Sequence, residues 1–242
     1  MNLIDAHAHL ALMKAPKKAI GEASAAGVRI VESCIDDSTK KALDFEGVFL
    51  CIGASPSETS DEFVKGRISC IRENKARIVA VGEVGLDYHW VKDPKLQEKE
   101  RKNFRKFIEL SRELDKPLVI HSRKAEADAI EILRQEGCGR VMMHCFSGNF
   151  RQAVECVEQG WLVSVPTNIF WSKQKQDFAR KLPLENIVLE TDSPFLSPAR
   201  GQENRPVNVE LSARKIAELR DISFEEVAKQ TTKNAEQFFR IK

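Results

Sequence analysis

The amino-acid sequence predicts a single α/β domain, a (β/α)8 TIM-type barrel spanning residues 1–242. Its 242 residues are close to the roughly 250 typical of one such barrel. Eight short β-type runs alternate with helical segments, and polar side chains gather where those runs end. A doubly wound open sheet with a similar number of elements is the main alternative fold.

The predicted strands are short runs rich in valine and isoleucine, bounded by Gly, Pro, Asp or Asn. They are Leu3–Ala6, Val28–Ser33, Val48–Ile52, Ile78–Val84, Pro117–His121, Val141–His144, Trp161–Val165 and Ile187–Thr191. Each is followed by a helical or turn segment, as in a parallel barrel.

Apolar residues spaced three and four apart predict helices between the strands. The clearest is Glu98–Leu114, in which Phe104 and Phe107 belong to one apolar stripe. Further helices are predicted near Lys17–Ala26, Glu62–Glu73, Ala125–Gln135, Phe150–Glu158, Lys173–Lys181, Val209–Leu219 and Ser223–Phe239. Ser223 followed by Glu226 predicts a capping box.

Composition excludes several classes of protein. The net charge of only +2 is not that of a typical nucleic-acid-binding protein. A polyanion would therefore have to be held by locally clustered positive charge. No apolar run approaches the roughly 18 residues of a membrane span, and a strand at the very start leaves no room for a secretory leader. The six cysteines form no C-x-x-C pair and predict free thiols in a reducing compartment. We therefore expect a cytoplasmic monomer with no obligate protein partner.

Polar residues at the strand ends carry most of the functional information. Four of the five histidines lie at such positions, together with one glutamate and one aspartate. Active sites of (β/α)8 barrels are built at this face from several strands. The set predicts a metal site, with the ligands His7, His9, Glu83, His121, His144 and Asp192.

The geometry of strands explains how these residues could converge. Residues i and i+2 point to the same side of a strand, so the His7 and His9 imidazoles can reach one metal ion. Glu83 is expected on the inward face with Val79 and Val81, where a carboxylate is costly unless a cation satisfies it. Neutral imidazole at His121 and His144 suits Zn, Mn or Fe.

Three carboxylates receive different interpretations. Asp192 completes the ring of strand ends and could bind metal and accept the proton of an attacking water. Asp5 lies one layer deeper than His7 and is expected to support the site by orienting a histidine. Glu190 is expected to be a buried structural carboxylate with a basic partner.

Candidate substrate contacts lie in the loops of the same face. Arg123 follows the fifth strand, and Arg200, Asn204 and Arg205 lie in the long loop after Asp192. Arginine suits bidentate binding of phosphate. Trp90, Phe170 and Trp171 could stack on bases, although ordinary loop packing explains them equally well.

Several stretches resemble the TatD family of metal-dependent deoxyribonucleases, among the amidohydrolase-like barrels. They are Asp5-Ala-His-Ala-His9, Gly82-Glu-Val-Gly-Leu-Asp87, Pro117-Leu-Val-Ile-His121, His144-Cys-Phe-Ser-Gly148, Glu190-Thr-Asp-Ser-Pro194, Arg200-Gly-Gln-Glu-Asn-Arg-Pro206 and Thr232-Lys-Asn-Ala-Glu-Gln-Phe-Phe239. The resemblance covers the whole chain.

This resemblance implies two divalent ions in a (β/α)8 barrel. His7, His9, Glu83 and Asp192 would hold one ion, and Glu83 would bridge to a second held by His121 and His144. Several members of the family degrade DNA from the 3′ end. Two departures concern substrate fit: Ser55 stands where many members carry histidine, and Val165-Pro166 stands where many carry Ser-Gly.

The resulting hypothesis is a phosphodiesterase using two ions of Mg, Mn or Zn, with Glu83 and Asp192 as catalytic groups and DNA or another phosphoester as substrate. A hydrolase of small esters or C–N bonds is one alternative, although relatives of that kind usually bridge their metals with a carbamylated lysine. A catalytically silent binding protein is the other.

Overall fold

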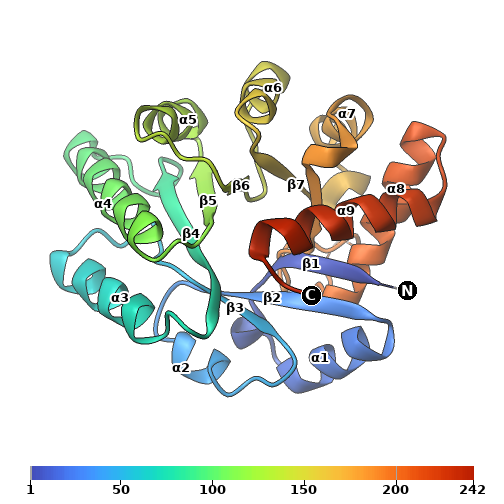
Figure 1. Ribbon diagram of the computed structural model, residues 1–242, viewed down its shortest axis with the longest axis horizontal. Coiled ribbons are helices and arrows are strands. Elements are labelled where there is room, and N and C mark those ends of the chain that lie inside the picture. The colour runs from blue at the N-terminus through green and yellow to red at the C-terminus, as the bar shows by residue number, and fades with distance from the viewer. Residues whose placement is uncertain (1, 200) are drawn as a thin grey trace.

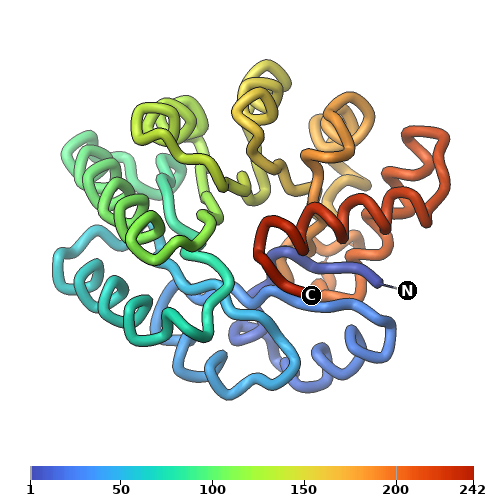
Figure 2. Tube along the Cα trace, in the orientation of Figure 1, coloured from blue at the N-terminus to red at the C-terminus, as the bar shows by residue number. Residues whose placement is uncertain are grey.

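The computed structural model describes residues 2–199 and 201–242. Its eight strands form one parallel sheet in the order β1 to β8, and helices surround the sheet (Figure 1). The chain passes around the barrel once from the N-terminus to the C-terminus (Figure 2). This architecture confirms the predicted (β/α)8 class over the open-sheet alternative.

Because the strands are parallel, their C-terminal ends lie together at one end of the barrel, where the polar residues gather. They are β1 (Leu3–Ala8), β2 (Val28–Cys34), β3 (Phe49–Ile52), β4 (Ile78–Asp87), β5 (Leu118–Arg123), β6 (Val141–Met143), β7 (Leu162–Pro166) and β8 (Ile187–Glu190).

The helices follow the strands along the chain. They are α1 (Pro16–Ala25), α2 (Thr39–Ala42), α3 (Asp61–Glu73), α4 (Pro94–Glu113), α5 (Glu126–Gln135), α6 (Phe150–Glu158), α7 (Lys173–Lys181), α8 (Val209–Arg220) and α9 (Phe224–Phe239). Short 3-10 helices are η1 (Leu10–Leu12), η2 (Thr167–Phe170), η3 (Leu184–Asn186) and η4 (Pro206–Asn208).

Alternation along the strands divides the apolar residues into two buried clusters. The inner cluster fills the barrel with one or two side chains from each strand: Ile4, Ala6, Val31, Cys51, Ala80, Val119, Met142, Leu162 and Val188. Their strand neighbours, such as Leu3, Ile120 and Leu189, pack outward against the helices. Because the interior is filled, ligands have access only at its polar end.

Helix α9 closes the end of the barrel at which the strands begin. Phe238 and Phe239 pack against the inner cluster, and the helix lies over β1 in Figure 1. The Asn234 side chain donates to the carbonyl of Ile187, the first residue of β8. The Ser223 hydroxyl accepts from the Glu226 backbone N–H at 3.1 Å, which confirms the predicted helix start.

The seam between β1 and β8 is joined by a few specific bonds. The Asp192 N–H donates to the His7 carbonyl at 2.9 Å, and the His9 N–H donates to the Ser193 carbonyl at 2.6 Å. The Asp5 carboxylate accepts from both the backbone N–H and the hydroxyl of Thr191. Asp5 Oδ1 also accepts from the His7 backbone N–H at 3.4 Å, so Asp5 supports the segment that carries His7 and does not contact its ring through any of these bonds.

An irregularity in β4 decides where Glu83 points. Val81 packs outward with the helices, whereas Ala80 lies in the inner cluster. Strict alternation would therefore send Glu83 outward with Val81, and the sequence argument that placed the two on one inward face was wrong. The pairing register with β5 shifts between Val81 and Val84, and this shift brings Glu83 to the inner face.

Several boundaries also differ from prediction. Strand β4 continues to Asp87, three residues beyond the predicted end, and β6 ends one residue before His144. Helix α4 begins at Pro94 because the Asp93 carboxylate caps it by accepting from the Lys95 N–H. Among the described residues, no helix has the length and apolarity needed to span a bilayer. All six cysteines are free, as predicted.

The close approach of β4 and β5 generates a stability prediction. A Cβ at Gly85 would collide with the His121 carbonyl oxygen, in a backbone that cannot move without shifting β5. We expect Gly85→Ala to lower the free energy of unfolding by about 3 kcal/mol or more. Gly66→Ala is the matched control, because nothing lies near a Cβ at that helical position, and it should raise stability by about 0.5–1 kcal/mol. Urea denaturation measures both, and equal effects would contradict the argument.

Candidate metal centre

The first two candidate ligands come from the end of β1. The Nε2 atoms of His7 and His9 lie 3.2 Å apart, so both rings are directed at one point. The Nδ1 atom of His9 lies 3.0 Å from the Ser33 carbonyl oxygen. Since a carbonyl can only accept, Nδ1 carries a hydrogen, and Nε2 is the nitrogen that faces the site.

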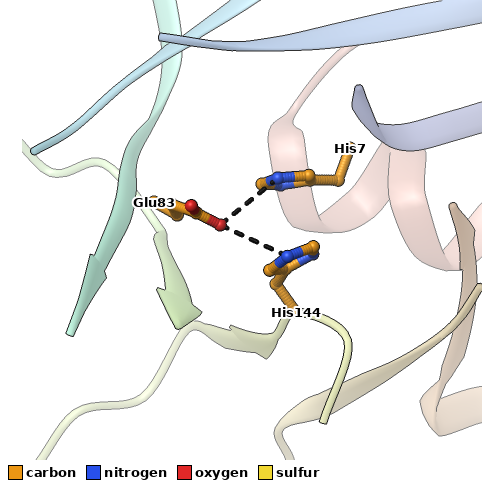
Figure 3. A group of neighbouring side chains, drawn as sticks. All are labelled: His7, Glu83 and His144. Atoms are coloured by element: carbon orange, nitrogen blue, oxygen red, sulfur yellow. Dashed lines mark ion pairs between the residues drawn. The ribbon is translucent and has the colours of Figure 1, made fainter. Parts of the chain in front are cut away.

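The Glu83 carboxylate points towards both His7 and His144 (Figure 3). Its Oε2 atom is 3.3 Å from the Nε2 atom of each ring, and the two rings stack with centroids 3.6 Å apart. The same oxygen is buried and lacks a hydrogen-bond partner. Ligand atoms that share an ion at about 2.0–2.2 Å lie roughly 3–3.5 Å apart, so the arrangement fits a divalent cation. An unpartnered buried carboxylate oxygen is otherwise costly.

Glu190 supports His144 from the barrel interior. Its Oε2 atom lies 2.9 Å from the Nδ1 atom of His144, and its Oε1 atom accepts from the Cys145 N–H. Glu190 therefore has a basic partner, as expected, and that partner is a candidate metal ligand. The contact directs the Nε2 atom of His144 at Glu83.

His121 is held in the opposite orientation. Its Nε2 atom lies 2.9 Å from Asp87 Oδ2, whereas its Nδ1 atom lies 3.8 Å from Glu83 Oε2. Sequence reasoning missed Asp87 because it ended the strand at Val84. Strand β4 continues to Asp87, four residues after Glu83. Because side chains alternate along a strand, the two carboxylates lie on the same face.

Asp192 lies opposite Glu83 and is the more exposed of the two carboxylates. Its Oδ1 atom is 3.5 Å from His9 Nε2 and 3.9 Å from His7 Nε2. Its backbone adopts the left-handed conformation with φ 55°, and so does that of Cys145, next to His144, with φ 42°. Such conformations are uncommon for these residues and concentrate at functional sites.

Two groups of candidate ligand atoms lie close enough together to hold a metal ion. One group is His7, Glu83 and His144, and the other is His7, His9 and Asp192. His7 belongs to both groups, and the bridging of two ions by Glu83 stays a prediction. His121 belongs to neither group, although its Nδ1 atom lies 3.8 Å from Glu83 Oε2.

Protons occupy part of this site in the absence of metal. Burial lowers the pKa of His9, but the Asp192 carboxylate and the charge of Glu83 outweigh it and raise that pKa to about 9. Burial likewise opposes protonation of His121, but Asp87 and Glu83 raise its pKa to about 10. Burial and the neighbouring His144 hold the pKa of His7 well below its usual range.

The predicted substrate contacts have different surroundings. Arg123 is exposed, with its guanidinium over the Trp90 ring at 5.9 Å. Arg205 is half-exposed and pairs with Glu22 of α1 at 2.8 Å. Asn204 cannot bind substrate as predicted, because it is fully buried and its amide bonds to Thr167 and the Thr191 carbonyl. Arg200 lies outside the described residues.

The contacts of Asp87 generate a prediction about metal content. Its Oδ1 atom accepts from two backbone N–H groups, those of His89 and Trp90. In Asp87→Asn the amide oxygen must keep these bonds, so the amide NH2 faces His121 Nε2 and forces the imidazole hydrogen onto Nδ1. We expect the affinity for metal at His121 to fall about 10- to 100-fold, measured by elemental analysis after dialysis. Asp128→Asn, which changes a half-exposed carboxylate bonded to Tyr88, is the control. Unchanged metal content in Asp87→Asn would contradict the prediction.

The raised pKa values of His9 and His121 predict that metal binding depends on pH. Below pKa values of about 9 and about 10, both rings carry protons that a metal must displace. Affinity for Zn²⁺ or Mn²⁺ should therefore rise from neutral pH towards the pKa of His9. Calorimetry near neutral pH, in buffers with different ionisation enthalpies, should show net release of protons. Affinity that is independent of pH over this range would refute the assignment.

Comparisons with known proteins show similarity to metal-dependent hydrolases over the whole chain. The family model described as TatD related DNase matches residues 4–240. The Bacillus subtilis protein named uncharacterized metal-dependent hydrolase YabD is 37% identical over 99% of both chains. Human deoxyribonuclease TATDN3 is 39% identical over 70% of this chain and 62% of its own. The crystal structure of the Escherichia coli TatD homologue YjjV superposes with a TM-score of 0.90 at 25% identity, covering 99% of this chain and 98% of that one. The chain therefore belongs to the TatD-related DNase family of metal-dependent hydrolases.

Proposed function

We propose that this protein is a metal-dependent phosphodiesterase, a deoxyribonuclease acting as a 3′–5′ exonuclease with two divalent ions of Mg, Mn or Zn. The observation that carries the proposal is the buried Glu83 Oε2 atom, which has no hydrogen-bond partner and faces two imidazole nitrogens. His7, His9, Glu83, His121, His144 and Asp192 would hold the ions.

Each residue has a distinct task in this proposal. Divalent ions bound here would lower the pKa of water and neutralise phosphate charge. Asp192 would accept the proton of the attacking water, since its carboxylate is the more exposed one at the mouth of the site. Glu83 would bind metal together with His7 and His144, the two imidazoles that its Oε2 atom faces. Arg123 would bind a phosphate oxygen through its exposed guanidinium.

Two further observations favour a phosphodiester substrate. A relative that shares 39% identity over 70% of this chain is named a deoxyribonuclease. Arg123 provides local positive charge beside the site on a chain whose net charge is only +2. Arg205 would contribute only after leaving Glu22. We expect the protein to act as a cytoplasmic monomer without an obligate protein partner.

The two departures from the family pattern lie close to the site. The Ser55 hydroxyl is 3.1 Å from that of Ser57, in the loop after β3. Pro166 ends β7 and pairs in register with Glu190, the residue behind His144. Neither position is a candidate metal ligand, so we expect both departures to bear on substrate fit.

The proposal predicts metal-dependent release of mononucleotides from single-stranded DNA labelled near its 5′ end. Activity should disappear after EDTA treatment and return with Mg²⁺, Mn²⁺ or Zn²⁺. Glu83→Gln should lose both metal and activity, because an amide is a weak metal ligand. Asp192→Asn should lower kcat by about 100- to 10,000-fold, the usual contribution of a general base. Gel analysis of the labelled products measures both.

The same assay separates the alternatives. A protein that binds metal but cleaves no DNA would keep the hydrolase assignment and discard DNA, and small esters and cyclic amides would be assayed next. A protein without metal-dependent turnover on any of these substrates would be a binding protein. Gly66→Ala is the control for losses of activity during purification and metal exchange, because that exposed helical position lies outside the site.

A further inference from the structure

Exposed apolar side chains gather at the mouth of the barrel. The described residues include eight large apolar side chains with high exposure, and six of them lie in segments that follow strand ends. Those six are Leu12, Trp90, Phe150, Phe170, Trp171 and Phe195. Large exposed apolar groups around a polar site are typical of a binding surface.

Phe195 is in direct contact with the candidate metal centre. It follows β8, and its ring centroid lies 6.1 Å from that of His9 in an edge-to-face arrangement. The Phe195 N–H donates to the Asp192 carbonyl at 2.8 Å, which ties the ring to a second candidate ligand. Half of the residue nonetheless remains exposed, at 51%. The ring therefore offers a free surface at a position set by the metal centre.

Trp90 has an equivalent place on the β4 side. Its backbone N–H donates to Asp87 Oδ1, and Asp87 Oδ2 contacts His121. The Asp87 carboxylate thus holds the ring of one candidate metal ligand, His121, and also the backbone of the loop that carries Trp90. Trp90 is 67% exposed, and the Arg123 guanidinium lies 5.9 Å from its ring.

The two aromatic residues follow strands on opposite sides of the barrel. Strands β4 and β8 are four places apart in the strand order of the eight-stranded barrel, and the candidate metal centre lies between their ends. A chain-like substrate crossing the mouth would meet one ring on each side of the bond at the metal centre.

We propose that Trp90 and Phe195 are stacking platforms that bind nucleobases of the substrate strand on the two sides of the metal centre. The inference rests on the proposed function and deepens it. Aromatic rings stack on any base, and only an unpaired strand exposes the faces of its bases to them. Arg123 beside Trp90 suits a substrate that alternates flat rings with negative charge.

Other occupants fit this surface less well. A lipid surface requires a continuous apolar patch, whereas these two rings are separated by histidine and carboxylate side chains. An apolar protein partner would have to cover the same charged groups without satisfying them. A strand of nucleotides brings a phosphate to the centre and rings to its sides.

The test is binding of a hydrolysis-resistant, phosphorothioate-linked oligothymidylate to the metal-loaded protein, measured by fluorescence anisotropy. Trp90→Leu and Phe195→Leu should each weaken binding about 5- to 150-fold, the usual effect of removing one stacked base. Trp90→Phe and Phe195→Tyr are the matched controls, because they keep an aromatic ring and should retain binding. An abasic strand of the same length should bind equally to all five proteins, and a blunt duplex should bind weakly to all.

The outcomes separate this inference from the proposed function. Leucine variants that bind the base-containing strand as tightly as the wild type would overturn the stacking role, whether or not DNA is cleaved. An equal loss of binding to the abasic strand would also overturn it, since the rings would then act on the backbone or on the fold. Loss confined to the base-containing strand would support the platforms, even if no metal ion produced cleavage. A wild-type protein that binds neither strand would remove both proposals.

Discussion

The structure is organised around one buried carboxylate, that of Glu83. Its Oε2 atom has no hydrogen-bond partner and faces imidazole nitrogens of His7 and His144 at 3.3 Å. Burial alone would raise the pKa of this group, yet the neighbouring histidines hold it well below its usual range. A carboxylate kept charged in the interior needs a cation, and the surrounding residues are arranged so that a proton or a metal ion can supply one.

A second layer of acceptors determines which nitrogen each histidine presents. The Ser33 carbonyl, Glu190 and Asp87 contact the far nitrogens of His9, His144 and His121 respectively. These contacts leave Nε2 of His9 and His144, but Nδ1 of His121, directed towards the site. Asp87 also bonds to the backbone of the Trp90 segment, so the same layer links the metal centre to the surface that would receive substrate.

The sequence predicted the fold and the membership of the site more accurately than the direction of individual side chains. Alternation along regular strands correctly brings His121 in line with Val119, and His144 with Met142, both of which lie in the barrel interior. The same rule fails in β4, because the register shift between Val81 and Val84 exchanges the two faces. Loop position was also a poor guide for Asn204, which was expected to contact substrate and which packing buries completely.

The sequence by itself determined the barrel class, because periodic apolar patterns report burial over whole elements. It also determined which polar residues lie at strand ends, since these are local properties of the chain. Only the tertiary structure decided that Asp87 supports His121, that Asp5 joins β1 to β8, and that Arg205 pairs with Glu22. Those contacts join residues distant in sequence, and their distances depend on register shifts and loop paths that no local pattern encodes.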